Sequence, residues 1–456
     1  MTENIDLNTS PKHSKVRGML HSFLESQTSG GLVLLICTII ALVVANVPSL
    51  VHLQELWHIN AGITIGDFKL EMSVMHWIND ALMAVFFFVV GLEIKREMLV
   101  GELSSVKKAT LPIFAALGGM LVPAAIYAIF NHGTPTSNGW GIPMATDIAF
   151  SLGVLSVFKT RVPIGLKVFL AALAVADDLG GIIVIALFYT SHINMTALAI
   201  SGLCVAVLVL GNIFKMRSKA FYLGIGLVLW YFMLNSGIHA TIAGVIVAFC
   251  IPATLRKGTG HYLERIRNNV NKFPVVDVDD RHNTIVFTHD EIHTLKSIES
   301  AADKMISPLQ DLEDSLHGMI NFFIVPLFAF ANAGIDLSQM SIGSLFSGVG
   351  LAVMLGLIAG KFLGVFSFSW LAVRLGFVTL PHGSTWKAFA SVCVVCGIGF
   401  TVSMFIADLS YAGLGTTGEA LLNQAKLGVL CGSVIAAVLG CFLLNKTLPK
   451  DGNLIG

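Results

Sequence analysis

The chain has few charged residues for its length. Of its 456 residues only 12% are Asp, Glu, Lys or Arg, and 55% are hydrophobic, whereas about 25% of the residues in a soluble domain are charged. The formal net charge is zero, so charge gives no reason to expect a nucleic-acid partner. This composition excludes a soluble domain and predicts an all-α polytopic membrane protein.

The chain also lacks the patterns of a disulfide framework or a secreted protein. Its seven cysteines all lie in apolar segments, where thiols behave as small hydrophobic side chains. Cys393 and Cys396 have the spacing of a redox or metal pair, but no second Cys or His pair accompanies them, so packing is the favoured role. The N-terminus stays polar to about Gln27, which argues against a signal peptide. We expect no cofactor.

What the chain does have is long apolar runs. Segments of spanning or near-spanning length predict about twelve transmembrane helices, the seventh and eighth of them short. They lie at about 30–48, 76–94, 109–130, 140–158, 164–189, 196–214, 219–234, 237–253, 319–335, 343–373, 388–411 and 418–444.

Lys and Arg gather in alternate connections between these segments. The connections 131–139, 190–195, 336–342 and 412–417 carry neither residue, the intervening connections and both ends are basic, and only Lys69 breaks the alternation. Because basic loops stay in the cytoplasm, both termini are expected there. The chain then divides into a cytoplasmic segment 1–29, helices one to eight over 30–253, a cytoplasmic loop 254–307, helices nine to twelve over 308–445, and a tail 446–456.

Two of the connections have their own structure. In the outer loop 49–75, apolar residues alternate from Trp57 around the turn pair Gly66-Asp67, which predicts a periplasmic β-hairpin at about 55–72. An isolated hairpin is barely stable, so it is expected to pair with something, and a homodimer is the expected arrangement.

In the inner loop 254–307, Thr288 and Glu291 form a capping box that opens an amphipathic helix. Lying on the helix bundle is the favoured role of this helix, and binding a partner protein is the alternative. Its apolar face would carry Ile292, Leu295, Ile298, Ala302 and Met305.

Two adjacent aspartates, Asp177 and Asp178, stand in the middle of the fifth apolar segment. One carboxylate at bilayer depth costs about 2.5–3.5 kcal/mol on insertion scales, so intramembrane acids are usually functional. Close carboxylates in a low dielectric do not both ionise easily, which suits an exchange of protons for a cation. An ion or proton site is the favoured interpretation, and a helix–helix hydrogen bond is the alternative.

Two other segments carry signs of interruption. Pro143 and the polar pair Thr146-Asp147 interrupt the fourth segment, and an exposed backbone at this depth must line protein or a water-filled cavity. A simple proline kink is the alternative. Gly397 and Gly399 can unwind the eleventh segment at a similar depth, and two interrupted helices in corresponding halves of a chain point to a transport site.

Lys361 is an intramembrane cation in the tenth segment, more than ten residues from either end. A lysine at this depth needs a carboxylate partner or must lose its proton, so an ion pair with one of the central aspartates is expected, with snorkelling as the alternative. Lys426, in the last segment, receives no role.

The runs around these residues resemble the NhaA-type sodium/proton antiporters. The resemblance extends from about Gly30 to Lys446, with 255–307 as the main interruption. It rests on INDALMAVFFFVVGLEIKRE, ATDIAFSLGVL, ADDLGGIIVIALFYT, SGIHATIAGVIVAF, PLFAFANAG, IAGK and CGIGFTVSMFIA.

The resemblance implies two inverted repeats, formed by helices three to five and ten to twelve, with helices four and eleven unwound and crossing. It makes Asp178 the main cation and proton carboxylate, pairs Asp177 with Lys361, and makes Asp177 the second carboxylate of the Na⁺ site. The residues expected to shape the crossing are Thr146, Asp147, Gly397 and Gly399.

By the same resemblance, charged and histidine side chains outside the centre would sense pH, and Asp80 would be structural or line the access path. The chain departs from the family at Asp314, where a histidine is expected, and in its long 254–307 loop. The expected pH-sensing residues are Glu93, Arg96, Glu97, Glu313, His317 and His239.

The implied function is electrogenic, pH-regulated export of Na⁺ or Li⁺ in exchange for protons across the bacterial inner membrane, without enzyme chemistry. Three alternatives fit less well. An intramembrane aspartyl protease carries one aspartate on each of two helices, one of them in Gly-x-Gly-Asp, whereas here Phe400 follows Gly399. A proton-coupled carrier of an organic solute would need a roomier polar pocket, and a cation channel would need a pore ring.

Overall fold

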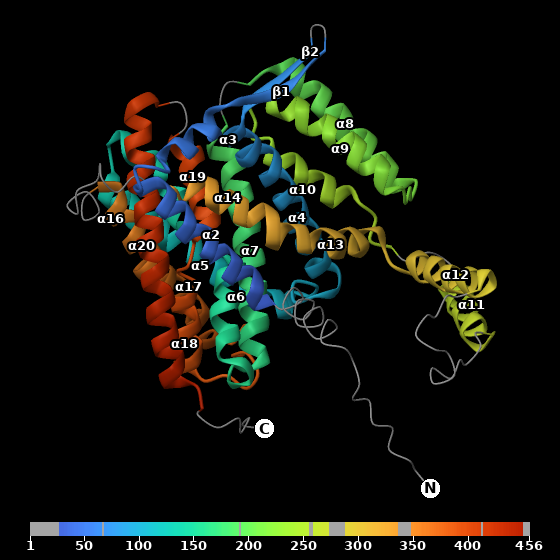
Figure 1. Cartoon of the computed structure of the whole chain (residues 1–456). Helices are drawn as coiled ribbons and strands as arrows, with labels where there is room; N and C mark the ends of the chain where they lie inside the picture. Colours follow the sequence, from blue (N-terminus) through green and yellow to red (C-terminus); the bar gives the residue numbers. More distant parts are fainter. Residues whose placement is uncertain are drawn as a thin grey trace.

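The fold is that of a polytopic helical membrane protein with one small β-hairpin (Figure 1). A computed structural model describes residues 27–65, 68–190, 193–254, 259–272, 288–335, 348–411 and 414–449. The expected N-terminal segment, the C-terminal tail, much of the 254–307 loop and the turn pair Gly66-Asp67 lie outside these residues.

The first half of the chain forms nine α-helices, four shorter helical segments and two strands, counted over the described residues. They are α2 (Gln27–Asn46), η1 (Val51–His58), β1 (Asn60–Ile65), β2 (Phe68–Ser73), α3 (Val74–His76), η2 (Trp77–Leu82), α4 (Met83–Val100), α5 (Val106–Asn131), η3 (Pro135–Met144), α6 (Ile148–Val157), η4 (Lys159–Arg161), α7 (Ile164–Phe188), α8 (Met195–Ile213), α9 (Lys219–Leu234) and α10 (Thr241–Cys250).

The second half begins with two helices of the long loop and continues through the remaining spans. Its elements are α11 (Thr259–Lys272), α12 (His289–Met305), α13 (Pro308–Met319), η6 (Ile320–Ile324), α14 (Val325–Asn332), α16 (Gly348–Leu355), η7 (Gly356–Gly360), α17 (Lys361–Arg374), α18 (Trp386–Val395), α19 (Phe400–Tyr411) and α20 (Gly415–Thr447).

The predicted membrane spans are present. Among the described residues, 8 continuous helices are long and apolar enough to cross a membrane, and η3–α6 and α18–α19 each form a span bent at a short break. The apolar helices α9 and α10 are shorter and correspond to the two short predicted segments. The expectation of two interrupted helices is confirmed.

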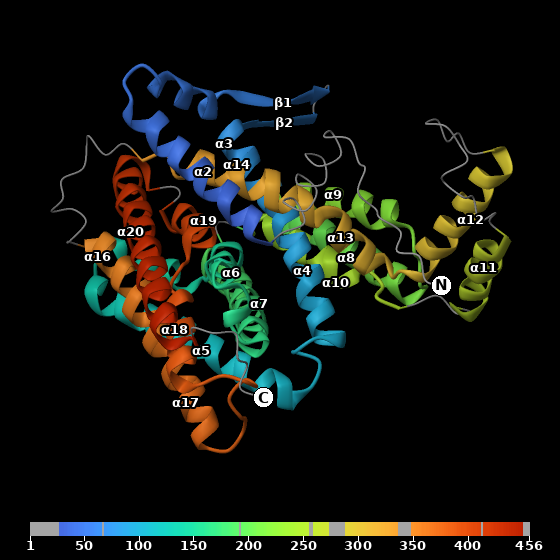
Figure 2. The same ribbon diagram turned by 60° about the horizontal axis from the view of Figure 1, so that its bottom comes forward.

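The spans pack into two bundles that meet along one interface (Figure 2). The first bundle contains α5, η3–α6, α7, α16–η7–α17, α18–α19 and α20; the second contains α2, η2–α4, α8, α9, α10 and α13–η6–α14. Between them, α2 contacts α6, α4 contacts α7, and α14 contacts α19.

Close backbone packing inside the first bundle brings α17 against α5. A methyl group added at Gly118 would lie 2.2 Å from the Gly364 carbonyl oxygen, and one added at Gly364 would lie 2.1 Å from that of Gly118. Only glycine allows two helices to approach so closely. The approach sets α17, and with it Lys361, deep in the bundle.

The β-hairpin marks one side of the molecule, here called the hairpin side. Strands β1 and β2 pair antiparallel from Asn60–Ser73 to Ile65–Phe68, as the alternating pattern predicts. The alternation does not begin at Trp57, because Val51–His58 forms a 3₁₀ helix instead. Two hydrogen bonds tie the hairpin to the second bundle, from Trp77 Nε1 to the Ala61 carbonyl (2.7 Å) and from Val74 N to the Ile59 carbonyl (3.0 Å).

The opposite side carries α11 and α12 and is here called the loop side (Figure 1). The predicted capping box of Thr288 and Glu291 opens α12. However, α12 packs on α11, where Ser297 accepts hydrogen bonds from Arg265 and Asn269, rather than lying on the bundle with its predicted apolar face. Ile292 and Leu295 of that face are exposed. Helix α11 was not predicted, although Leu263, Ile266 and Val270 recur at helical spacing within its mostly polar sequence.

Candidate functional site

The two bent spans cross inside the first bundle. The η3–α6 span bends by 41° and the α18–α19 span by 44°. At the crossing, the Asp147 amide donates to the Ile398 carbonyl (2.7 Å), and the Thr146 hydroxyl lies 3.0 Å from the Cys396 carbonyl oxygen. Each break therefore satisfies backbone or side-chain polar groups of the other. This is required inside a membrane, where no water is available to hydrogen-bond an exposed backbone.

Asp147 stabilises the start of the two half-helices that follow the breaks, α6 and α19. Its Oδ1 accepts from Phe150 N (3.0 Å) at the first turn of α6, and its Oδ2 accepts from Thr401 N (3.1 Å) and Thr401 Oγ1 (2.6 Å) at the first turn of α19. A carboxylate suits this place because helix N-termini carry partial positive charge.

Lys361 and Asp177 lie together beside the crossing. Lys361 Nζ is 2.5 Å from Asp177 Oδ2, and both side chains are fully buried. The Thr146 hydroxyl lies 2.8 Å from the same carboxylate oxygen. The π-helical turn η7 immediately precedes Lys361, and such turns often occur at functional sites.

Asp178 faces the interface between the bundles. It is buried, and its Oδ1 has no hydrogen-bond partner among the described residues. It lines a cavity of about 140 Å³, which is bounded by both bundles and extends toward Glu93 and His317. Asp147 and Thr401 lie in the same wall. A buried carboxylate with an unpartnered oxygen at a cavity is what a hard cation or a proton would bind.

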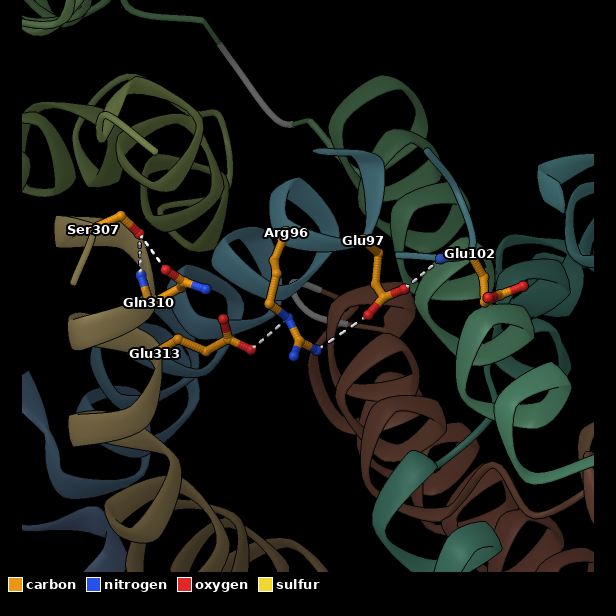
Figure 3. A network of polar contacts seen from close by, with 6 residues as sticks. All are labelled: Arg96, Glu97, Glu102, Ser307, Gln310 and Glu313. Carbon is orange, nitrogen blue, oxygen red and sulfur yellow. Dashed lines mark hydrogen bonds and ion pairs between the residues drawn. The ribbon is translucent and has the colours of Figure 1, made fainter. Parts of the chain in front are cut away.

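Three of the predicted pH-sensing residues form a network on the loop side (Figure 3). Arg96 lies between two carboxylates, with its Nε 3.1 Å from Glu313 Oε1 and its Nη2 3.2 Å from Glu97 Oε1. Glu97 also accepts from the Glu102 amide (3.0 Å), so the network ties α4 to the turn that follows it and to α13.

The other predicted pH-sensing residues are placed differently. Glu93 and His317 line the cavity, and His317 lies within hydrogen-bond distance of Asn321 (3.1 Å). His239 is not part of this group: it precedes α10 on the hairpin side and interacts electrostatically with Asp408. Asp80 lies in η2, also near Asp408.

Four polar residues on the hairpin side received no role in the sequence analysis. They connect to one another by hydrogen bonds across the two bundles. A signal was available, since Asp408 is a carboxylate inside an apolar segment and Lys426 a second intramembrane lysine. The four residues are Asn79, Asn332, Asp408 and Lys426.

Comparison with known proteins agrees with this geometry. A family model described as "Na+/H+ antiporter 1" matches residues 21–444. The chain is similar to the Na(+)/H(+) antiporter NhaA of Phocaeicola vulgatus, with 50% identity covering 93% of this chain and 94% of that protein. It is also similar to the proteins of that name from Bacteroides fragilis strain ATCC 25285 (49% identity; 94% and 98% covered) and Shewanella loihica (43%; 95% and 98%). The chain therefore belongs to the Na⁺/H⁺ antiporter 1 family of secondary transporters, which are not enzymes.

Proposed function

We propose that this protein exchanges Na⁺ or Li⁺ for protons by alternating access, with Asp178 as the principal binding carboxylate and Asp177 beside it. The membrane is the bacterial inner membrane, the hairpin side faces the periplasm, and both termini lie in the cytoplasm. This orientation rests on the distribution of Lys and Arg among the loops.

The observation that carries the proposal is the contrast between the two aspartates. The Oδ1 atoms of both aspartates are buried without a hydrogen-bond partner among the described residues. Asp177 Oδ2 is held by Lys361 and Thr146, whereas Asp178 lines the cavity that also reaches Glu93 and His317, and Asp177 does not. Asp178 is therefore available for a cation, and a cation that also takes Asp177 as a ligand must compete with Lys361.

Competition for the same carboxylates couples the two fluxes. A cation and protons cannot occupy the pair together, because each neutralises the negative charge that attracts the other. If two protons replace one cation, as the family resemblance implies, each cycle moves one net charge inward. An inside-negative membrane potential then favours cation export by about 2.3 kcal/mol per 100 mV.

The Arg96 network is a suitable place for pH regulation. It stands beside the loop-side end of the cavity, where Glu93 and His317 form part of the wall. Protonation of these groups would alter the charge at the entrance and the contacts between α4 and α13. The proposed regulation thus acts on access to Asp178 from the cytoplasm.

The experiment that tests the proposal is proton flux in inside-out vesicles that hold a respiration-generated pH gradient, read with a pH-sensitive dye. Na⁺, Li⁺ and K⁺ are added in turn at several pH values. We expect Na⁺ and Li⁺ to dissipate the gradient, with rates that rise with pH. Asp178→Asn removes the negative charge at nearly constant shape and should abolish the response.

The control is Glu55→Gln, which removes the charge of an exposed carboxylate in η1, outside the cavity lining. It should retain exchange. Substantial Na⁺-driven flux in folded Asp178→Asn would remove that residue from the proposed role. If the wild type responds to no cation, the alternative of a proton-coupled carrier of an organic solute is favoured again.

A further inference from the structure

A chain of three hydrogen bonds crosses between the bundles on the hairpin side. Lys426 Nζ donates to Asn332 Oδ1 (3.4 Å), Asn332 Nδ2 donates to Asn79 Oδ1 (2.8 Å), and Asn79 Nδ2 donates to Asp408 Oδ2 (2.9 Å). Lys426, Asn332 and Asn79 are buried and Asp408 is partly buried. We call these four residues the polar clip.

The chemistry of its two ends fixes the direction of the clip. An ammonium group can only donate and a carboxylate can only accept, whereas an amide does both. Each asparagine therefore presents its oxygen toward Lys426 and its nitrogen toward Asp408. Such a chain, with a charge at each end, is stronger than one between neutral groups.

The two ends and the middle of the clip belong to different bundles. Asp408 on α19 and Lys426 on α20 are in the first bundle; Asn79 in η2 and Asn332 at the end of α14 are in the second. Two of the three hydrogen bonds thus join the bundles, and the bond between the asparagines lies within one. Any movement that separates the bundles on this side must break both outer bonds.

An apolar layer separates the clip from the central aspartates. Phe405 lies one turn from Asp408 on α19, with its ring 5.6 Å from that of Phe87 and 6.3 Å from that of Phe328. These rings also come from both bundles and are fully or almost fully buried. On the other side of the layer, the same interface opens into the Asp178 cavity.

We propose that the polar clip is the closed gate on the hairpin side, and that its four residues set the balance between the two access states. The inference rests on the proposed function, because alternating access requires the hairpin side to open. The clip forms when the loop side is open, as here, and breaks when the transported cation leaves toward the hairpin side.

The test is the apparent KM for Na⁺ measured separately in inside-out and right-side-out vesicles, for wild type, Asp408→Leu, which removes the acceptor of the clip, and Lys426→Met, which removes its donor. Loss of the clip lowers the population of the loop-open state, and the apparent affinity on that side falls with it. We expect the loop-side KM to rise and the hairpin-side KM to fall, each by roughly threefold to tenfold.

Tyr127→Phe is the matched control. Tyr127 and Tyr411 share a hydrogen bond (2.7 Å) on the same side, but α5 and α19 both belong to the first bundle. This variant should lower the melting temperature without moving the two KM values in opposite directions. Clip variants that lose stability and leave both KM values unchanged, or shift them the same way, would show that the clip is only structural.

A second measurement does not depend on exchange. Phe405→Cys places a thiol behind the clip, and a membrane-impermeant thiol reagent is applied from the hairpin side with and without Asp408→Leu. We expect labelling above that of the native cysteines to be several-fold faster in the double variant than in Phe405→Cys alone, because loss of the clip raises the population of the hairpin-open state. Equal labelling of both would overturn the gate. If labelling depends on the clip but the wild type shows no Na⁺-driven flux, the proposed function is rejected while the proposal that the clip is a gate still stands.

Discussion

The protein buries two lysines in neighbouring spans, and their surroundings differ. Lys361 on α17 contacts a carboxylate of α7, so both members of its ion pair belong to the first bundle. Lys426 on α20 reaches an amide of α14, and its chain of contacts passes through the second bundle before it ends at Asp408. The first arrangement can persist while the bundles move against each other, and the second cannot.

The difference suggests that Lys361 holds the binding site together, whereas Lys426 controls access to it. A direct ion pair inside one rigid unit compensates two buried charges at all times. A chain of weaker bonds between two units compensates them in one state only, and its bonds can exchange for water when the interface opens. The two lysines should therefore respond differently to the same substitution.

The largest expected effect is that of Lys361→Ala. It leaves the Asp177 carboxylate buried without its cation, which should cost about 3–5 kcal/mol of stability and abolish exchange. Lys426→Ala is the comparison: it removes a donor to an amide and should cost only about 0.5–1.5 kcal/mol. The measurement is the melting temperature of each variant in detergent, beside Na⁺-driven proton flux. Equal melting temperatures for the two variants would contradict the distinction between the lysines.

The next effect is that of fixing the clip covalently. In Asn79→Cys/Asp408→Cys, a short bifunctional thiol reagent joins the two bundles, and exchange should stop in proportion to the linked fraction. In Asn79→Cys/Asn332→Cys the same reagent joins two helices of the second bundle. Exchange there should be the same before and after linkage, because the link does not oppose movement between bundles. Undiminished exchange by fully linked Asn79→Cys/Asp408→Cys would show that the bundles do not separate at the clip.

The sequence predicted the centre of the site better than its hairpin side, for a physical reason. Asp177, Asp178 and Lys361 are charges in otherwise apolar runs, and Pro143 and the two glycines mark breaks in helices, so each signal is local. The family resemblance supplied their pairing. The clip depends on which helices come together in the fold. Asparagines such as Asn79 and Asn332 are uncharged, so the sequence alone does not mark them as unusual in an apolar segment.

The pairing of α11 with α12 and the π-helical turns were also beyond local signals. Leu263, Ile266 and Val270 indicate an amphipathic helix at α11, but the sequence does not say that this helix packs on α12 of the same loop rather than on the bundle. A π-helical turn such as η7 is one extra residue accommodated by packing, and the run of apolar residues from Gly348 to Gly360 gives no sign of it. Both features depend on tertiary contacts.

The smallest expected effect on transport lies outside both bundles, in the β-hairpin. Ile63 in the middle of β1 is 59% exposed, and the two-stranded sheet leaves both of its edges unpaired among the described residues. An exposed edge can pair with another chain, which is the physical basis for the homodimer that we propose.

Ile63→Lys adds a charge to this surface and should weaken dimers, while vesicle exchange by each protomer stays at the wild-type rate. Ile193→Lys is the control, because Ile193 is 50% exposed but lies outside the hairpin, just before α8. The measurement is the monomer–dimer equilibrium in detergent, for example by analytical ultracentrifugation. Dissociation of Ile63→Lys with full exchange would show that the gate and the binding site work within one protomer. An unchanged monomer–dimer equilibrium would show that the hairpin does not form the dimer contact. Loss of exchange in Ile63→Lys would show that access to the site also depends on the hairpin and not on the clip alone.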